Sequence, residues 1–165
     1  MADIGTGSGA IAVTLATQVP NLHILATDIS PAALDIAKGN AKKFKVEKQI
    51  EFVECDLLPA NPRAPIHLLC ANLPYIPTET LHGLPIYGRE PTLALDGGPD
   101  GLDLYRKLLK QITNRIAEEY LILLEIENTQ GQSASNLASQ FFPKANVQIH
   151  QDLAGHDRLI EIQFS

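Results

Sequence analysis

The sequence has few of the features that mark several large classes of protein. Two cysteines, Cys55 and Cys70, stand far apart, and no His/Cys spacing typical of a metal site occurs, so buried reduced thiols and no bound metal are expected. No apolar run is long enough to cross a membrane, and the strongest covers only Tyr120–Leu124. The start of the chain lacks the basic region of a signal peptide. These absences predict a cytoplasmic protein without a membrane partner.

The chain also lacks a basic tract. Its formal net charge is −6, with 13 Lys and Arg against 19 Asp and Glu. Tight binding to a phosphate backbone needs clustered positive charge, so direct nucleic-acid binding is not expected. What is present is a composition of 45% hydrophobic and 19% charged residues over 165 positions. This composition is typical of one soluble globular domain, residues 1–165. The oligomeric state is left open.

Short apolar runs alternate with helical patterns along the chain. The predicted strands are Ala2–Ile4, Leu22–Thr27, Ile50–Cys55, Ile66–Ala71, Tyr120–Ile126, Val147–Gln151 and Arg158–Phe164. The predicted helices are Ser8–Gln18, a helix capped by Ser30-Pro31 that runs towards Phe44, a capped helix over about Leu104–Glu119, and Gln132–Phe142.

This alternation predicts an α/β fold with a mostly parallel seven-stranded sheet and helices on both faces. The last two strands are joined by only the short loop Asp152–Asp157, which leaves no room for a crossover helix. They are therefore expected to form a C-terminal antiparallel hairpin. The segment Pro74–Gly101 is too long for an ordinary connection and is predicted to be a functional loop.

A glycine-rich turn follows the first predicted strand, in Asp3-Ile4-Gly5-Thr6-Gly7-Ser8-Gly9. Glycines allow a tight turn and a close approach of the backbone to a ligand, and the helix N-terminus that follows presents free N–H groups. The same residues satisfy the looser dinucleotide-binding pattern that ends in alanine, here Ala10. A turn that merely packs a helix on a strand is the third interpretation. The turn therefore indicates a nucleotide-like ligand without deciding which.

Polar side chains follow consecutive strands, at Asp28, Asp56 and Asn72. The ligand crevice of an open α/β sheet lies beyond the carboxyl ends of its strands. Asp28 suits a ribose diol in either ligand class. Asp56 suits an adenine amino group with Leu57 packing on the ring, although a strand-ending turn residue is an equally good interpretation.

The most informative stretch is Asn72-Leu73-Pro74-Tyr75, at the end of the fourth strand. An amide nitrogen is a poor nucleophile because its lone pair is delocalised. The Asn72 side-chain oxygen and the Leu73 carbonyl can accept both of its hydrogens, while Pro74 fixes the turn and Tyr75 offers a ring to a planar group. Catalysis would then rest on positioning and electrostatics. A plain turn after a strand is the competing interpretation.

These motifs resemble a known family. The glycine turn, continued through Ala10-Ile11-Ala12, resembles the cofactor motif of class I methyltransferases, whose fold is Rossmann-like. Asn72–Tyr75 resembles the Asn-Pro-Pro-Tyr motif of amino- and amide-nitrogen methyltransferases. Three further stretches are similar to HemK-type release factor glutamine methyltransferases: Glu90–Arg106, Glu125–Gly131 and Asp152–Arg158.

The resemblance implies methyl transfer from S-adenosylmethionine to the Gly-Gly-Gln glutamine of a peptide chain release factor. By position it assigns cofactor binding to Asp3, Gly5, Thr6, Gly7, Gly9, Asp28, Ile29, Asp56, Leu57 and Asn72. Catalysis is assigned to Asn72, Leu73, Pro74 and Tyr75, and substrate binding to Asn72, Tyr75 and Glu90.

Two departures from the family pattern stand out. Leu73 replaces the usual first proline of the motif, but the carbonyl survives that change. The chain starts inside the first strand, without the helical N-terminal domain that helps family members dock the release factor, so the catalytic domain alone is expected. We therefore expect retained cofactor binding and weak or absent activity on intact release factor. Three alternatives stay open: a ribosomal-protein glutamine or nucleic-acid amino group as substrate, an inactive cofactor-binding module, and a dinucleotide oxidoreductase.

Overall fold

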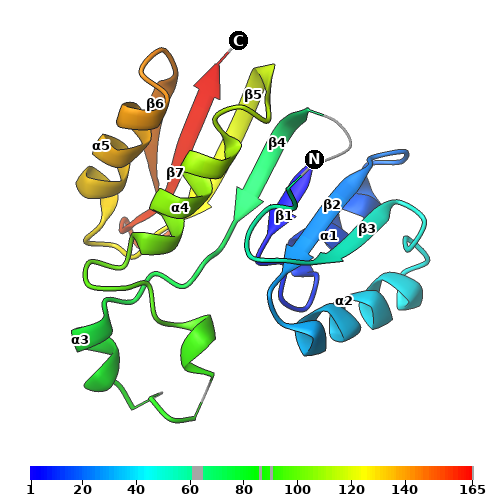
Figure 1. Ribbon diagram of the computed structural model, residues 1–165, viewed down its shortest axis with the longest axis horizontal. Coiled ribbons are helices and arrows are strands. Elements are labelled where there is room, and N and C mark those ends of the chain that lie inside the picture. The colour runs from blue at the N-terminus through cyan, green and yellow to red at the C-terminus, as the bar shows by residue number, and fades with distance from the viewer. Residues whose placement is uncertain (61–64, 86, 90, 165) are drawn as a thin grey trace.

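The computed structural model describes residues 1–60, 65–85, 87–89 and 91–164. It contains one sheet of seven strands in the order β3-β2-β1-β4-β5-β7-β6 (Figure 1). The strands are β1 Ala2–Ile4, β2 Ile24–Asp28, β3 Ile50–Glu54, β4 Ile66–Ala71, β5 Ile116–Glu125, β6 Asn146–Gln151 and β7 Asp157–Phe164. The helices are α1 Ala10–Gln18, α2 Pro31–Lys43, α3 Thr78–His82, the 3₁₀ turn η1 Thr92–Ala94, α4 Asp103–Ile112 and α5 Gly131–Phe141.

The sheet is parallel over five strands and antiparallel at one edge. β1 lies in the middle, where Ala2 stands opposite Leu25 of β2 and Leu69 of β4. β3 and β5 extend this parallel part. β7 pairs antiparallel with both β5 and β6. The predicted parallel sheet with a C-terminal antiparallel hairpin is confirmed.

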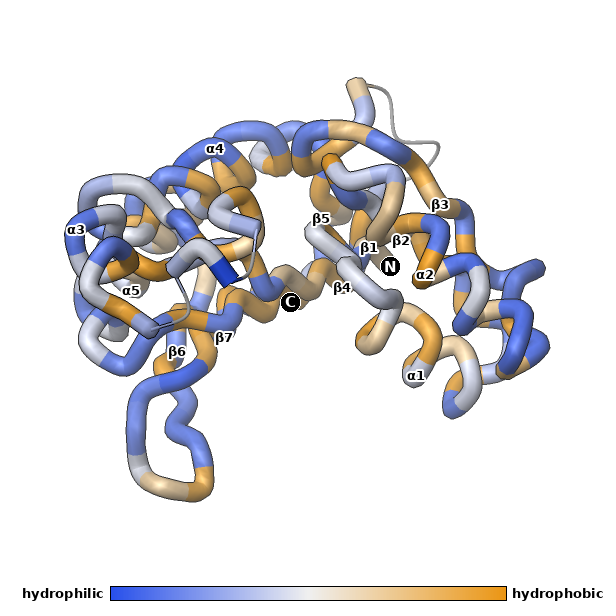
Figure 2. Tube along the Cα trace, turned by 90° about the horizontal axis from the view of Figure 1, so that it is seen from below, coloured by the Kyte–Doolittle hydropathy of each residue, from blue (hydrophilic) through white to orange (hydrophobic). Residues whose placement is uncertain are grey.

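Helices cover both faces of the sheet because side chains of a strand alternate between faces. On one face, Ala12 and Val13 of α1 pack with Ala26 of β2 in a small core. On the other, Ala2 and Ile4 belong to a larger core that includes the buried residues of α4 and α5. Asp3, between them, points towards α1. Figure 2 shows α1 and α4 on opposite sides of the strands.

One predicted helix was wrong in its extent. The helix expected over Leu104–Glu119 ends at Ile112 as α4, and no side chain caps its start. β5 begins at Ile116, which pairs with Ile66 of β4. The run Ala117-Glu118-Glu119 favours a helix locally, but pairing with β4 outweighs that preference.

The long segment after β4 is folded back on itself. α3 and η1 lie within it, and a short parallel bridge joins Ile76 to Asp96. The Ile76 amide donates to the Leu95 carbonyl at 3.1 Å, and the Gly97 amide donates to the Ile76 carbonyl at 2.9 Å. The Asp96 carboxylate adds bonds from the Thr78 hydroxyl at 2.7 Å and the Gly98 amide at 2.9 Å. The two ends of the loop are therefore tied together beside the Asn72–Tyr75 stretch.

In the part of the chain that the structure describes, no helix combines the length and apolar character needed to cross a membrane.

Candidate active site

The chemistry-bearing residues meet at one edge of the sheet. The glycine turn follows β1, Asp28 ends β2, Asp56 lies shortly after β3 and Asn72 follows β4. These four strands are parallel neighbours, so their carboxyl ends share an edge. The sequence prediction that these residues gather beyond the strand ends agrees with this arrangement.

The three glycines of the turn all have left-handed backbone conformations, with φ of 68° at Gly5, 56° at Gly7 and 80° at Gly9. A side chain at Gly5 would meet the Leu73 side chain at 2.9 Å, and one at Gly9 would meet Ala37 of α2 at 3.1 Å. At Gly7 an added Cβ would meet nothing within 4 Å. Gly5 and Gly9 thus serve close packing, while Gly7 borders open space in which a ligand can lie against the backbone.

Asp28 ties the glycine turn to the end of β2. One carboxylate oxygen accepts from the Gly7 amide and the other from the Ser30 amide, each at 2.9 Å. Each oxygen keeps a further lone pair. The carboxylate is only half-buried, so those lone pairs can accept from the hydroxyls of a ribose. Ile29, the next residue, is 50% exposed beside it.

Asp3 and Thr6 face inward. The Asp3 carboxylate is buried and accepts from the Thr6 hydroxyl at 2.6 Å and the Ala12 amide at 3.1 Å. Burial raises the pKa of Asp3 because it disfavours the charged form, while the two hydrogen bonds act in the opposite direction. The structure places both side chains inside the turn, where they hold its shape.

The residues after β3 divide between surface and core. Asp56 is half-exposed and pairs with Lys107 of α4. Leu57 has a φ of 68° and its side chain is 7% exposed within the larger core. Its carbonyl accepts from the buried Thr27 hydroxyl at 2.6 Å. Leu57 therefore offers little surface to a ring, whereas Asp56 keeps carboxylate oxygens within reach of solvent.

Asn72 and Leu73 place two acceptors at the mouth of the sheet. Asn72 is exposed, and its side chain has no hydrogen-bond partner among the described residues. The Leu73 side chain is buried against the glycine turn, with 3% exposed. The Leu73 carbonyl accepts from the Tyr105 hydroxyl at 3.4 Å, and the same hydroxyl makes a shorter bond to the Glu125 carbonyl. The Leu73 oxygen therefore keeps one of its two lone pairs. The replacement of proline by leucine thus fills space beside Gly5 and leaves the carbonyl available.

Tyr75 is anchored at both ends. Its hydroxyl donates to the Glu125 carboxylate at 3.4 Å, and its carbonyl accepts from the Gln130 side chain at 2.8 Å. The pKa of Tyr75 is raised, first by burial and then by the Glu125 charge, so the phenol stays neutral. Pro74, half-buried, connects this anchored residue to Leu73. The predicted substrate residue Glu90 lies outside the described residues.

Two buried residues of this region received no role from sequence. Tyr105 lies on the apolar face of α4 and is 1% exposed, and Gln130 precedes α5 and is 4% exposed. A tyrosine at a core-facing helix position was the one available signal for the first. Nothing local distinguishes Gln130 from an exposed glutamine, because its partners lie 30 and 55 residues away.

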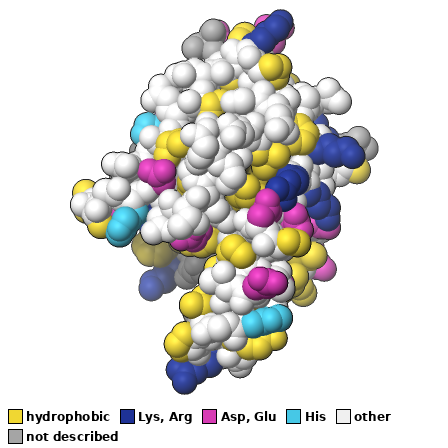
Figure 3. Space-filling model, turned by 90° about the vertical axis from the view of Figure 1, so that its left-hand side faces the viewer, with side chains coloured by type: hydrophobic (Ala, Val, Ile, Leu, Met, Phe, Trp, Pro, Cys, Tyr) yellow, Lys and Arg dark blue, Asp and Glu magenta, His cyan; other side chains and the backbone are white. Residues whose placement is uncertain are grey.

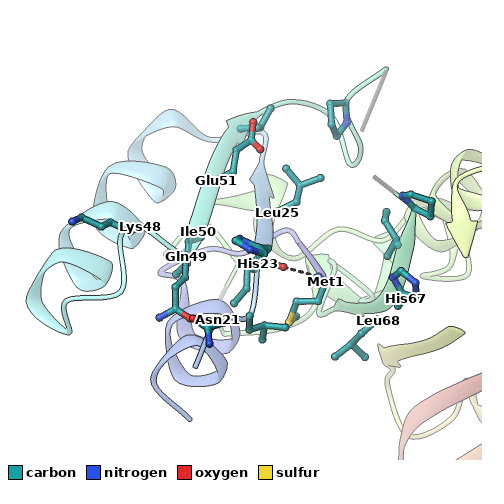
Figure 4. A pocket seen from close by; sticks show the side chains of 16 residues that line it. Met1, Asn21, His23, Leu25, Lys48, Gln49, Ile50, Glu51, His67 and Leu68 are labelled. Carbon is teal, nitrogen blue, oxygen red and sulfur yellow. Dashed lines mark hydrogen bonds between the residues drawn. The ribbon is translucent and has the colours of Figure 1, made fainter. Parts of the chain in front are cut away.

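A cavity of about 1020 Å³ lies on the other side of the sheet from the candidate site, at the amino ends of the parallel strands. It is lined by the amino ends of β2, β3 and β4, including His23, Ile50 and Leu68, with Met1 between them (Figure 4). The Met1 amino group donates to the His23 carbonyl at 2.7 Å. None of the motif residues lines this cavity, so it is separate from the candidate site.

Several charged side chains around the site form ion pairs. Arg106 of α4 bonds Asp100 and Asp103, and Lys107 bonds Asp56. The same mixing of basic and acidic side chains is visible on the face shown in Figure 3. Within the described residues, no group of three or more His, Cys, Asp or Glu side chains could hold a metal ion.

The fold and the site define a Rossmann-like α/β domain whose ligand edge carries a glycine turn, strand-end acids and an exposed asparagine. The family model described as "Methyltransferase domain" matches residues 1–83. The chain belongs to this methyltransferase domain family.

Known proteins agree with this assignment. A release factor glutamine methyltransferase from Moorella thermoacetica is 46% identical over 159 residues, which cover 96% of this chain and 56% of the relative. The chain thus spans about half the length of the curated relatives that it matches. Among solved structures, a ribosomal protein L11 methylase from Lactobacillus delbrueckii has a TM-score of 0.68 at 19% identity, covering 99% of this chain and 68% of that one. A Streptococcus mutans protein in complex with SAH has a TM-score of 0.67 at 15% identity, covering 98% and 86%.

Proposed function

We propose that this domain, residues 1–165, transfers a methyl group from S-adenosylmethionine to the side-chain amide nitrogen of a protein glutamine. The substrate that we favour is the Gly-Gly-Gln glutamine of a peptide chain release factor, in the cytoplasm, where translation takes place. The observation that supports the proposal is the exposed Asn72 side chain, which has no hydrogen-bond partner among the described residues, next to the Leu73 carbonyl, which has only the 3.4 Å bond from Tyr105, directly beside the glycine turn. The names of the relatives support the same substrate.

The residues present fit S-adenosylmethionine. Gly7 borders open space, so the backbone can lie against the amino-acid part of the ligand. The Asp28 carboxylate suits the ribose hydroxyls, and the exposed Ile29 and Asp56 suit the adenine. When bound, this cofactor supplies an electrophilic methyl group.

The chain's own part in the reaction is positioning. Asn72 Oδ1 and the Leu73 carbonyl would accept the two N–H hydrogens of the glutamine amide, which turns the nitrogen lone pair towards the methyl group. The nitrogen held in this way would be the acceptor of that methyl group and would give up one proton to solvent. The two oxygens also stabilise the positive charge that develops on the nitrogen. Tyr75, held by Glu125, presents its ring to the planar amide.

One experiment tests the substrate. The chain is incubated with isotope-labelled S-adenosylmethionine and a release factor, and the methyl group is located by mass spectrometry. We expect it on the glutamine of the Gly-Gly-Gln motif. A methyl group on another residue, or on a ribosomal protein or nucleic acid supplied in competition, would refute the assignment.

A further inference from the structure

Gln130 joins three segments that are distant in the sequence. Its side chain is buried at the start of α5. The amide nitrogen donates to the Tyr75 carbonyl at 2.8 Å and to the Asp100 carbonyl at 3.0 Å. The amide oxygen accepts from the Glu127 backbone amide at 3.0 Å. Both N–H groups are thus used on backbone carbonyls, one from the Asn72–Tyr75 stretch and one from the end of the Pro74–Gly101 loop.

The backbone around this side chain is packed too closely for any residue but glycine. Gly101 has a φ of 76°, and a Cβ there would lie 2.1 Å from the Tyr75 carbonyl and 2.2 Å from the Gln130 amide nitrogen. A Cβ at Gly97 would lie 2.8 Å from the Pro74 carbonyl. The backbone at Gly97 therefore packs directly on the Pro74 carbonyl, and the backbone at Gly101 packs directly on the Tyr75 carbonyl. The Gln130 amide donates to the second of these carbonyls.

Only a group with two donors satisfies this arrangement. The Tyr75 and Asp100 carbonyls accept these hydrogens in a part-buried setting, where an acceptor that loses its donor costs stability. A glutamine amide supplies both hydrogens and still accepts from Glu127. A carboxylate would set a negative charge against two carbonyl oxygens, and an apolar side chain would leave both unpaired.

We propose that Gln130 is a positioning residue for methyl transfer: by holding the Tyr75 carbonyl against the loop, it fixes the direction of the Leu73 carbonyl and of Asn72. Only Pro74 separates Leu73 from Tyr75, and the φ of Pro74 is fixed by its ring. The remaining torsions between the Leu73 and Tyr75 carbonyls are the ψ of Pro74 and the φ and ψ of Tyr75. The close packing of Gly97 on the Pro74 carbonyl and of Gly101 on the Tyr75 carbonyl restricts these rotations, so a displacement of the Tyr75 carbonyl also moves the Leu73 acceptor. The role of Gln130 in catalysis rests on the proposed function. Its attachment of the Pro74–Gly101 loop to the Tyr75 carbonyl does not.

The test compares substitutions at Gln130 with the same substitutions at Gln132, which is exposed on α5 and bonds only Asn136 at 2.9 Å. Gln130→Met removes both donors at similar volume. Its kcat for a Gly-Gly-Gln peptide is expected to fall by about 10²-fold, since a small misplacement of reacting groups costs that much. The affinity for S-adenosylmethionine, measured by calorimetry, should stay within about twofold of wild type, because Gln130 touches none of the glycine turn. Gln132→Met should resemble wild type in both.

A pH profile separates positioning from a general loss of structure. Gln130→Glu in its protonated form can donate to the Tyr75 carbonyl, so its kcat relative to that of Gln132→Glu should rise as the pH is lowered. The other titratable or charged groups near this position are Tyr75, Asp100, Glu125, Glu127, Asp157 and Arg158. They are common to both variants, so the ratio reports the carboxyl group introduced at position 130 together with any shift that it imposes on these neighbours. A flat ratio, or a parallel loss of cofactor affinity in Gln130→Met, would overturn the proposal.

Hydrogen exchange tests, without any turnover, whether Gln130 fastens the Pro74–Gly101 loop to the Tyr75 carbonyl; we call this fastening the clamp. The amides of Ile76, Thr78 and Gly97 bond across the loop at 3.1, 3.0 and 2.9 Å. Their exchange should accelerate at least about tenfold in Gln130→Met and stay unchanged in Gln132→Met, since local opening governs exchange. Unchanged exchange in Gln130→Met would refute the clamp. Faster exchange in a chain that methylates no substrate would uphold the clamp and refute the proposed function instead.

Discussion

Single residues at the sheet edge differ in whether their polar atoms are free. The Asp3 carboxylate accepts hydrogen bonds from the Thr6 hydroxyl and from the Ala12 amide of α1. The Asn72 side chain, in contrast, makes no hydrogen bond with the described residues. An exposed asparagine side chain without a hydrogen bond contributes little to stability, and the Leu73 carbonyl beside it has only the 3.4 Å bond from Tyr105. It is well suited to take the two hydrogens of an amide.

Asn72→Ala separates catalysis from cofactor binding. We expect methyl transfer to fall by about 10²-fold or more, because one of two acceptors on the reacting nitrogen is lost. The calorimetric affinity for S-adenosylmethionine should change by no more than about threefold. An exposed glutamine-to-alanine change at Gln132 serves as the control. Activity close to wild type in Asn72→Ala would refute the proposed mechanism.

The raised pKa of Asp3 predicts that the stability of the folded protein depends on pH. Burial raises its pKa above the ordinary value of 3.8, so the folded protein binds this proton more tightly than the unfolded chain does. Its contribution is therefore most favourable below pH 3.8 and is lost as the pH rises through the folded-state pKa. Asp3→Asn keeps an acceptor for Thr6 and Ala12 without the buried charge.

The free energy of unfolding of Asp3→Asn, relative to wild type, should accordingly increase from acid to neutral pH, by about 1.4 kcal/mol for each unit of pKa shift. Urea titrations at several pH values measure it. Asp35→Asn, whose side chain is 79% exposed on α2, should show no such trend. A difference that does not vary with pH would contradict the raised pKa.

At the scale of elements, local sequence rules succeeded where an element carries its own signals. Ser30 and Pro31 marked the start of α2, and the structure shows the Ser30 hydroxyl accepting from the Ala33 amide at 3.3 Å. They failed at α4, where neither glycine nor proline follows the end of the helix at Ile112. Its continuation as β5 depends on pairing with β4 and β7, which adjacent residues do not reveal.

Ser30→Ala tests the cap of α2. Loss of the hydroxyl leaves one N–H at the helix start without its partner, so we expect the free energy of unfolding to drop by about 0.5–2 kcal/mol. Ser139→Ala, on the exposed side of α5 with a hydroxyl that bonds only the Ser135 carbonyl, should change it by less than about 0.5 kcal/mol. Equal effects of the two substitutions in denaturant unfolding would show that the cap is not a specific feature.

At the scale of the whole molecule, the site exists only because four strands end at one edge. The glycine turn and Asn72 are far apart in the sequence, and the Leu73 side chain brings them into contact at Gly5. A ligand at this edge touches the ends of several elements at once. Its binding is therefore expected to stabilise the entire domain.

S-adenosylmethionine at about 100 times its Kd should add about 2.7 kcal/mol to the free energy of unfolding, and NAD should add nothing. Gly7→Ala should abolish this gain by filling the open space at the turn. Gly155→Ala is the matched control, since Gly155 also has a positive φ, of 81°, with nothing within 4 Å, but lies in the β6–β7 turn. Stabilisation by NAD, or retained stabilisation in Gly7→Ala, would refute the assigned cofactor site.

The sequence alone determined the order of the seven strands, the glycine turn after the first and the position of Asn72 and Leu73 after the fourth, because alternation, capping and turn residues act over a few positions. Tertiary structure decided which polar groups stay available. It buried Asp3 and Leu57, paired Asp56 with Lys107, and set Gln130 between carbonyls of two distant segments. The physical reason is that burial and hydrogen-bond satisfaction depend on neighbours that only the folded chain brings together.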